Sequence, residues 1–265
     1  MFEFTEGRLP VLVSIPHDGR AIPDGIAGRM TDAARANTDA DWHVRRLYDF
    51  AAELGANVIA ARQSRYVVDL NRDPADTALY PGTVNTGIVP ILTFDGAPLY
   101  RNGAEPEEAE VAERIAAYWR PYHGKLAETL DDLRGRFGGA VLFDAHSIRC
   151  EVPRLFDGRL PDFNLGTSSG ASADADLESR VYKVLAAADG FTSVLNGRFT
   201  GGYITRAYGR PKDGIHAIQL ELSQRTYMNE APPFEYLPER AEEVRKPLRA
   251  AVSALCGWAN DRFAG

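Results

Sequence analysis

Short apolar runs recur along the chain, separated by polar loops and by stretches with helical spacing. Residues 11–15 (VLVSI) and 140–144 (AVLFD) are almost entirely apolar, which predicts buried strands. The same reasoning predicts further strands at 57–61, 66–70, 191–195 and 216–222, with one more near 88–92.

Helical spacing appears between these runs. The apolar residues from Val44 to Leu54 lie on one face of a helix predicted over about 40–54. The same pattern predicts helices at 106–136, with a break or kink at Pro121, at 174–188 and at about 238–260, whereas 74–104 and 153–173 have the composition of loops. Strands that alternate with helices predict an α/β sandwich around a mainly parallel or mixed sheet.

The composition is that of an ordinary globular protein. Of 265 residues, 45% are hydrophobic and 25% are charged, which suits one α/β domain over residues 1–265. Two cysteines do not make a disulfide framework, so we expect a reducing compartment, the cytoplasm. Residues 1–10 lack the apolar run of a signal peptide, and no stretch approaches the ~18 apolar residues of a membrane span. A net charge of −7 without a basic block argues against nucleic acid as a partner, although it does not forbid an anionic small-molecule substrate.

Polar side chains follow the predicted strands at the points where the strands end. These are His17, Asp69 with Arg72, and His146. Ligands of open α/β sheets bind outside the carboxyl ends of the strands, where these side chains gather if the strands are parallel.

Two of the five histidines, His17 and His146, directly follow apolar strands. A hydrolytic zinc site needs about three nitrogen or oxygen ligands and one open position for water. His17 and His146 are therefore candidate ligands, and Asp41 or Asp39 is a candidate third. The alternative is that the histidines are ordinary loop residues and that the two aspartates complement the dipole of the predicted helix.

Two further segments carry candidate chemistry. Arg72 can bind a carboxylate in a bidentate manner, or it can form a structural ion pair with Asp69 or Asp73. Glu221 lies between leucines in a predicted strand, where it is either a buried general base or a glutamate on a solvent-facing edge. The segment 201–209 (GGYITRAYG) combines glycines with an arginine and is either a binding loop or an ordinary turn.

One motif points to different chemistry. Residues 166–170 (GTSSG) match the G-x-S-x-G nucleophile elbow of serine hydrolases, but 161–165 make a poor strand, so we do not expect an elbow. His43 and His123 fall in predicted helices rich in charge, and both are interpreted as structural or surface residues.

An ordered set of segments resembles the N-formylglutamate amidohydrolases, and it spans nearly the whole chain. The segments are SIPHDG (14–19), TDADWH (38–43), SRYVVDLNRD (64–73), LFDAHSIR (142–149), LFDGRLPDFNLGT (155–167), NGRFTGGYITRAYG (196–209) and QLELSQRTYM (219–228). The family is similar to zinc carboxypeptidases and aspartoacylases. The resemblance therefore implies a three-layer α/β/α sandwich with a mixed, mainly parallel sheet of the phosphorylase/hydrolase-like, zinc carboxypeptidase-like type.

The resemblance also implies the reaction and the site. It implies hydrolysis of N-formyl-L-glutamate to L-glutamate and formate, the last step of a histidine degradation route. Zinc, or another divalent transition metal, is implied on two histidines and one carboxylate, with Asp41 preferred to Asp39. The implied set is His17, Asp41 and His146 for the metal, Glu221 and Arg65 for catalysis, and Asn71, Arg72 and Arg206 for the substrate.

Two other functions stay open at this point. The chain could be a deacylase for another N-acyl amino acid or a carboxypeptidase-like enzyme, because small changes of pocket shape separate such substrates. It could also be a non-catalytic, amino-acid-binding relative that keeps the fold.

Overall fold

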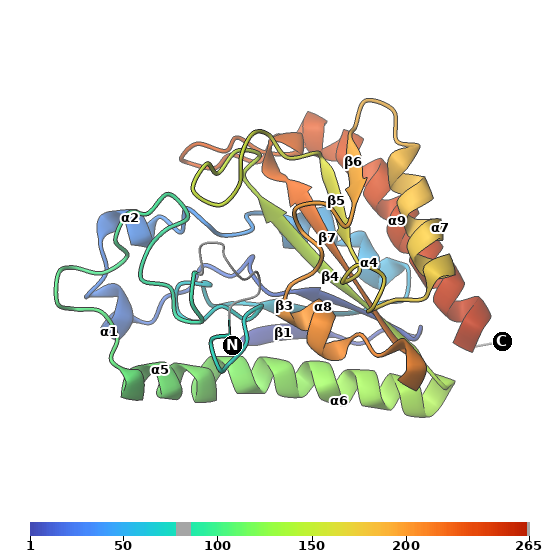
Figure 1. Ribbon diagram of the computed structural model, residues 1–265, viewed down its shortest axis with the longest axis horizontal. Helices are drawn as coiled ribbons and strands as arrows, with labels where there is room; N and C mark the ends of the chain where they lie inside the picture. Colours follow the sequence, from blue (N-terminus) through green and yellow to red (C-terminus); the bar gives the residue numbers. More distant parts are fainter. Residues whose placement is uncertain (78–85, 264–265) are drawn as a thin grey trace.

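A seven-stranded mixed sheet forms the centre of the computed structural model, which describes residues 1–77 and 86–263 (Figure 1). The strand order is β1-β3-β2-β4-β7-β5-β6. The strands β3, β2, β4 and β7 run parallel, β1 and β5 join this group antiparallel, and β6 is parallel to β5. The strands are β1 (Phe2–Thr5), β2 (Val11–Ile15), β3 (Asn57–Ala61), β4 (Ala140–Ile148), β5 (Phe163–Gly166), β6 (Ser193–Leu195) and β7 (Ile215–Ser223).

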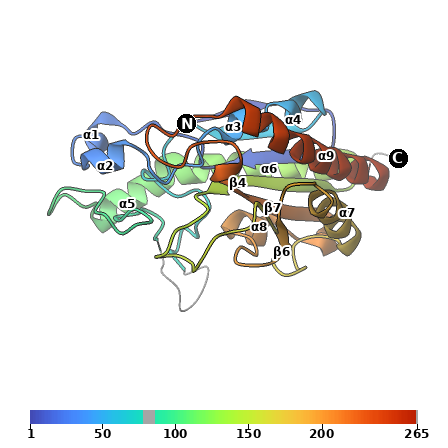
Figure 2. The same cartoon turned by 90° about the horizontal axis from the view of Figure 1, so that it is seen from above.

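Helices cover both faces of the sheet. The helices are α1 (Asp24–Ala27), α2 (Asp32–Arg35), α3 (Val44–Leu47), α4 (Phe50–Glu53), α5 (Glu108–Arg114), η1 (Ile115–Trp119), α6 (Arg120–Phe137), α7 (Ala175–Ala186), α8 (Tyr203–Tyr208), η2 (Pro211–Asp213), η3 (Gln224–Thr226) and α9 (Pro238–Phe263). Apolar residues of α5, η1, α6 and α8 pack on one face, and those of α3, α4, α7 and α9 pack on the other. Helix α6 runs below the sheet in Figure 1, and α7 and α9 lie side by side in both views (Figure 2).

The predicted layers and the mixed, mainly parallel sheet are therefore confirmed. Every residue of β2, β4 and β7 is buried, because helices cover both faces of these central strands. That double coverage explains why their sequences are continuous apolar runs rather than alternating ones. None of the helices within residues 1–77 and 86–263 has the length and apolar character needed to cross a membrane.

Two predicted strands are wrong. Residues 66–70 form turns in which the Ser64 hydroxyl accepts from Tyr66 N and the Asp69 carboxylate accepts from Asn71 N. These side chains satisfy backbone donors that a sheet would otherwise pair, while Tyr66 and its apolar neighbours are buried by tertiary contacts. Residues 88–92 contribute only an isolated bridge between Leu92 and Pro98.

Strands β1 and β5 lie where no strand is predicted, and two helices differ from the prediction in their boundaries. The helix predicted over 40–54 is present as the two short helices α3 and α4. The helix predicted over 106–136 is present, but Pro121 does not end it. Instead, a wide π-helical turn, η1, precedes the proline, which lies in the first turn of α6. Proline is tolerated there because its missing N–H and its ring clash fall where the regular hydrogen-bond ladder is already interrupted.

Candidate functional site

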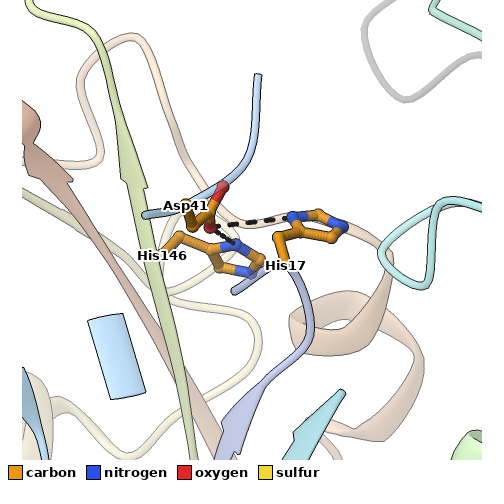
Figure 3. Close-up of side chains that lie close together, drawn as sticks. All are labelled: His17, Asp41 and His146. Atoms are coloured by element: carbon orange, nitrogen blue, oxygen red, sulfur yellow. Dashed lines mark hydrogen bonds and ion pairs between the residues drawn. The ribbon is translucent and has the colours of Figure 1, made fainter. Parts of the chain in front are cut away.

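Three buried side chains converge at the carboxyl edge of the parallel strands (Figure 3). His17 lies just past β2, His146 lies near the end of the neighbouring strand β4, and Asp41 comes from the loop before α3. Asp41 Oδ2 is 2.9 Å from His146 Nδ1 and 3.7 Å from His17 Nδ1. One ligand atom from each residue lies within 4.8 Å of the other two.

Each histidine is held from its other nitrogen by a second buried carboxylate. His17 Nε2 is 2.7 Å from Asp69 Oδ1, and His146 Nε2 is 2.8 Å from Asp144 Oδ2. An imidazole that donates Nε2–H to a carboxylate keeps its Nδ1 lone pair for a metal ion. Both rings are therefore oriented with Nδ1 toward Asp41.

Two observations show that the cluster fits a cation. Among the residues that the structure describes, His17 Nδ1 is buried and has no hydrogen-bond partner. Burial lowers the pKa of His146, but the carboxylates of Asp144 and Asp41 outweigh burial and raise that pKa well above its usual range. The carboxylates around the cluster therefore favour positive charge at this point, and a dication on nitrogen and oxygen ligands suits them.

Glu221 lies beside this cluster. It is on β7, directly opposite His146 of β4, and only 8% of its surface is exposed. Burial raises the pKa of Glu221 to about 8, and the charge of Asp41 adds to that increase, while His146 opposes it. A cation on the ligands would also oppose the increase and favour the carboxylate. The alternative of a solvent-facing edge glutamate is wrong, because β7 is a central strand.

Arg65 bridges the two carboxylates on the side of His17. Its Nη2 is 2.7 Å from Asp69 Oδ2, and its Nη1 is 3.4 Å from Asp41 Oδ1. Asp39, the alternative third ligand, lies outside the cluster. Its Oδ2 accepts from the Tyr66 hydroxyl and from Phe94 N, and its Oδ1 is 3.7 Å from Arg149 Nη2.

Of the three residues implied for the substrate, Arg206 lies on α8 and Asn71 contacts that helix. Asn71 Oδ1 accepts from Ile204 N, and its Nδ2 is 2.9 Å from His146 Nε2 and 3.3 Å from Asp144 Oδ2, so the amide joins α8 to His146 and its support. Arg72 donates from Nη2 to the Thr86 hydroxyl and lies 3.8 Å from Asp69 Oδ2. Arg206 is exposed on α8.

Two side chains that contact the site, Asp144 and Gln219, were not predicted from the sequence. Asp144 could have been found, since it precedes His146 by two residues on a strand and must therefore share its face. Gln219 precedes Glu221 in the same way. Its Oε1 accepts from Gly202 N, which directs its Nε2 to within 3.5 Å of Glu221 Oε2.

The G-x-S-x-G segment does not form a nucleophile elbow. A strand does precede it, since Gly166 ends β5, contrary to the expectation of a loop there. However, helix α7 begins only at Ala175, so the tight strand–turn–helix geometry is missing. His43 donates to Phe234 O and His123 to Leu70 O, so both have structural partners, and His123 is buried rather than at the surface.

Comparison with known proteins agrees with the ordered motifs. The sequence model of the N-formylglutamate amidohydrolase family matches residues 9–228. An N-formylglutamate deformylase of Pseudomonas aeruginosa is 52% identical over 264 residues, which are 100% of this chain and 99% of that protein. One from Pseudomonas putida is 49% identical over 263 residues, with 99% and 98% coverage. The crystal structure of N-formylglutamate amidohydrolase from Ralstonia eutropha JMP134 superimposes with a TM-score of 0.83 at 26% identity and 98% coverage of both chains.

Proposed function

The chain belongs to the N-formylglutamate amidohydrolase family, and we propose that it hydrolyses N-formyl-L-glutamate to L-glutamate and formate, the last step of a histidine degradation route. One observation carries the proposal: in a chain 52% identical to an N-formylglutamate deformylase, the ligand atoms of His17, Asp41 and His146 converge beside a buried carboxyl group, Glu221.

Zinc, or another divalent transition metal, would be held by Nδ1 of His17, Nδ1 of His146 and a carboxylate oxygen of Asp41. An ion there would supply Lewis-acid chemistry, because it lowers the pKa of water toward neutrality and polarises a carbonyl oxygen. Asp69 and Asp144 support this assignment, since each contacts Nε2 of one imidazole and so turns its Nδ1 toward Asp41.

Glu221 is the proposed general base and acid. Its carboxylate takes a proton from the attacking water as the new C–O bond forms at the formyl carbon. It then gives that proton to the amide nitrogen as the C–N bond breaks, which releases the amino group of glutamate. Gln219 supports this role, because its amide lies next to the Glu221 carboxyl group.

Arg65 is the proposed donor to the negative charge that develops on the formyl oxygen. Asp69 and Asp41 hold its guanidinium group in one orientation, so little reorganisation accompanies the reaction. Arg72 and Arg206 are the proposed partners of the glutamate carboxylates. Asn71 is proposed to support the substrate site, because its Oδ1 accepts from Ile204 N of α8, the helix that carries Arg206.

One sheet with an apolar core on each face supports a single amidohydrolase domain over residues 1–265. Cys150 and Cys256 are both buried free thiols, which supports the proposed cytoplasmic location.

A substrate panel tests the proposed reaction. Amine release should be fastest from N-formyl-L-glutamate and slower from N-acetyl-L-glutamate and from N-formyl derivatives of neutral amino acids. A faster reaction with another N-acyl group would show that the formyl compound is not the preferred substrate. Binding of L-glutamate without hydrolysis of any of these compounds would show that the chain is a binding protein and not an enzyme.

A further inference from the structure

Four aromatic side chains form a cluster between the helical layer and the proposed substrate site. We name this set, Trp119, His123, Tyr203 and Tyr208, the aromatic clamp. The rings of Trp119 and His123 stack with centroids 3.7 Å apart and planes 15° apart. Tyr203 packs against both rings, and the ring of Tyr208 lies nearly parallel to that of His123, with centroids 5.8 Å and planes 16° apart. The clamp thus joins η1 and α6 to α8.

Two ring N–H groups of the clamp hold the segment that carries Arg72. Trp119 Nε1 donates to the backbone carbonyl of Arg72 at 3.0 Å, and His123 Nε2 donates to that of Leu70 at 2.8 Å. The Tyr208 hydroxyl lies 3.0 Å from His123 Nδ1, so the second ring nitrogen also has a partner. This segment is a turn rather than a strand, so no sheet ladder fixes its position.

The helical segment that carries Trp119 and His123 departs from regular α-helical geometry at η1. Trp119 is the last residue of the π-helical turn η1, and His123 lies four residues later, on the same face of the helix. Wide turns of this kind cost hydrogen-bond regularity and occur frequently at functional sites. Here the turn ends where the helix meets the carbonyl of Arg72.

We propose that Trp119 and His123 are positioning residues, which hold the backbone of Arg72 and the helix that carries Arg206 in fixed relation and so set the affinity for a dicarboxylate amino acid. The inference rests on the proposed function of Arg72. It concerns substrate binding, because the clamp holds the backbone carbonyl of Arg72 itself and packs on α8, which carries Arg206.

Trp119→Phe is the direct test, since it keeps an aromatic ring and removes only the indole donor. KM for N-formyl-L-glutamate should rise about 3- to 10-fold, the effect of one hydrogen bond, while kcat changes by less than about twofold. The Kd for L-glutamate, measured by calorimetry on the zinc-loaded protein, should rise equally. Trp258→Phe is the matched control, because it removes the 3.0 Å indole hydrogen bond from Trp258, on α9, to Asp176, on α7. Both of these helices pack on the opposite face of the sheet from η1, α6 and α8.

Two comparisons separate positioning from general destabilisation. In an Arg72→Ala background, Trp119→Phe should have no further effect on KM, because the residue through which it acts is gone. His123→Gln, which retains a donor for Leu70 O, should raise KM less than His123→Phe. An unchanged KM in Trp119→Phe, full additivity with Arg72→Ala, or an equal change in Trp258→Phe would overturn the inference. Lack of formate release by the wild type would instead contradict the proposed function itself.

Discussion

Replacing Asp69 with asparagine should weaken both the fold and the metal site. Asp69 is 1% exposed, and its carboxylate lies 2.7 Å from the Arg65 guanidinium, 3.8 Å from that of Arg72 and 2.7 Å from the His17 imidazole. Removing one partner of a buried ion pair leaves the other charge uncompensated, which costs about 3–5 kcal/mol. That is a large part of the ~5–15 kcal/mol that stabilises a typical domain.

The matched control is Asp49→Asn. Asp49 pairs with Arg245 at the same 2.7 Å, but its side chain is 61% exposed, so its loss should cost about 0–1 kcal/mol. The free energy of unfolding is measured by urea denaturation of the metal-free proteins at pH 7. Zinc affinity, measured by competition with a chromophoric chelator, should fall about 10- to 100-fold in Asp69→Asn only. Equal destabilisation by the two substitutions, with unchanged zinc affinity, would refute the reasoning.

Three further predictions address the base, the close packing and the pH dependence. Glu221→Gln should keep zinc but lower kcat by a factor of about 10²–10⁴, and near-normal turnover would remove Glu221 from its role. Gly202→Ala should lower zinc affinity and activity, because a Cβ at this position would lie 2.3 Å from Asn71 Nδ2. The control is Gly124→Ala, where a Cβ would have no atom within 4 Å, and thermal unfolding should show that this substitution stabilises α6 by about 0.5–1 kcal/mol. Burial lowers the pKa of His123 to about 4, so the stability it contributes is complete above pH 6.5 and is lost as the pH falls toward 4. The unfolding free energy of the wild type should therefore decrease by about 3 kcal/mol more than that of His123→Gln between pH 7 and pH 4, and parallel pH curves would contradict this.

The central strands of the fold could be predicted because all of their residues are buried. The strands β2, β4 and β7 are buried on both faces, so their apolar runs are uninterrupted and unambiguous. Residues 66–70 have the same local pattern but are buried by loop packing and by side-chain hydrogen bonds from Ser64 and Asp69. Periodicity cannot separate these two cases, because both bury every residue.

The sequence predicts those residues of the candidate site that lie at the ends of strands. His17 lies just past β2 and His146 lies near the end of β4, and these strands are parallel neighbours, so the proximity of the two histidines follows from the topology. The choice between Asp39 and Asp41 depends on the path of one loop, and the contacts that direct Asp39 away come from Tyr66 and Phe94, which are distant in sequence. No local pattern contains those contacts.

The most direct test of the account is formate release from N-formyl-L-glutamate by the purified protein, before chelation, after chelation and after zinc is added back. The account predicts activity that is lost on chelation and restored by zinc, in parallel with zinc bound at one site per chain. Full activity of protein shown to be free of metal would contradict the proposed metal centre, and absence of formate release with zinc bound would contradict the proposed substrate.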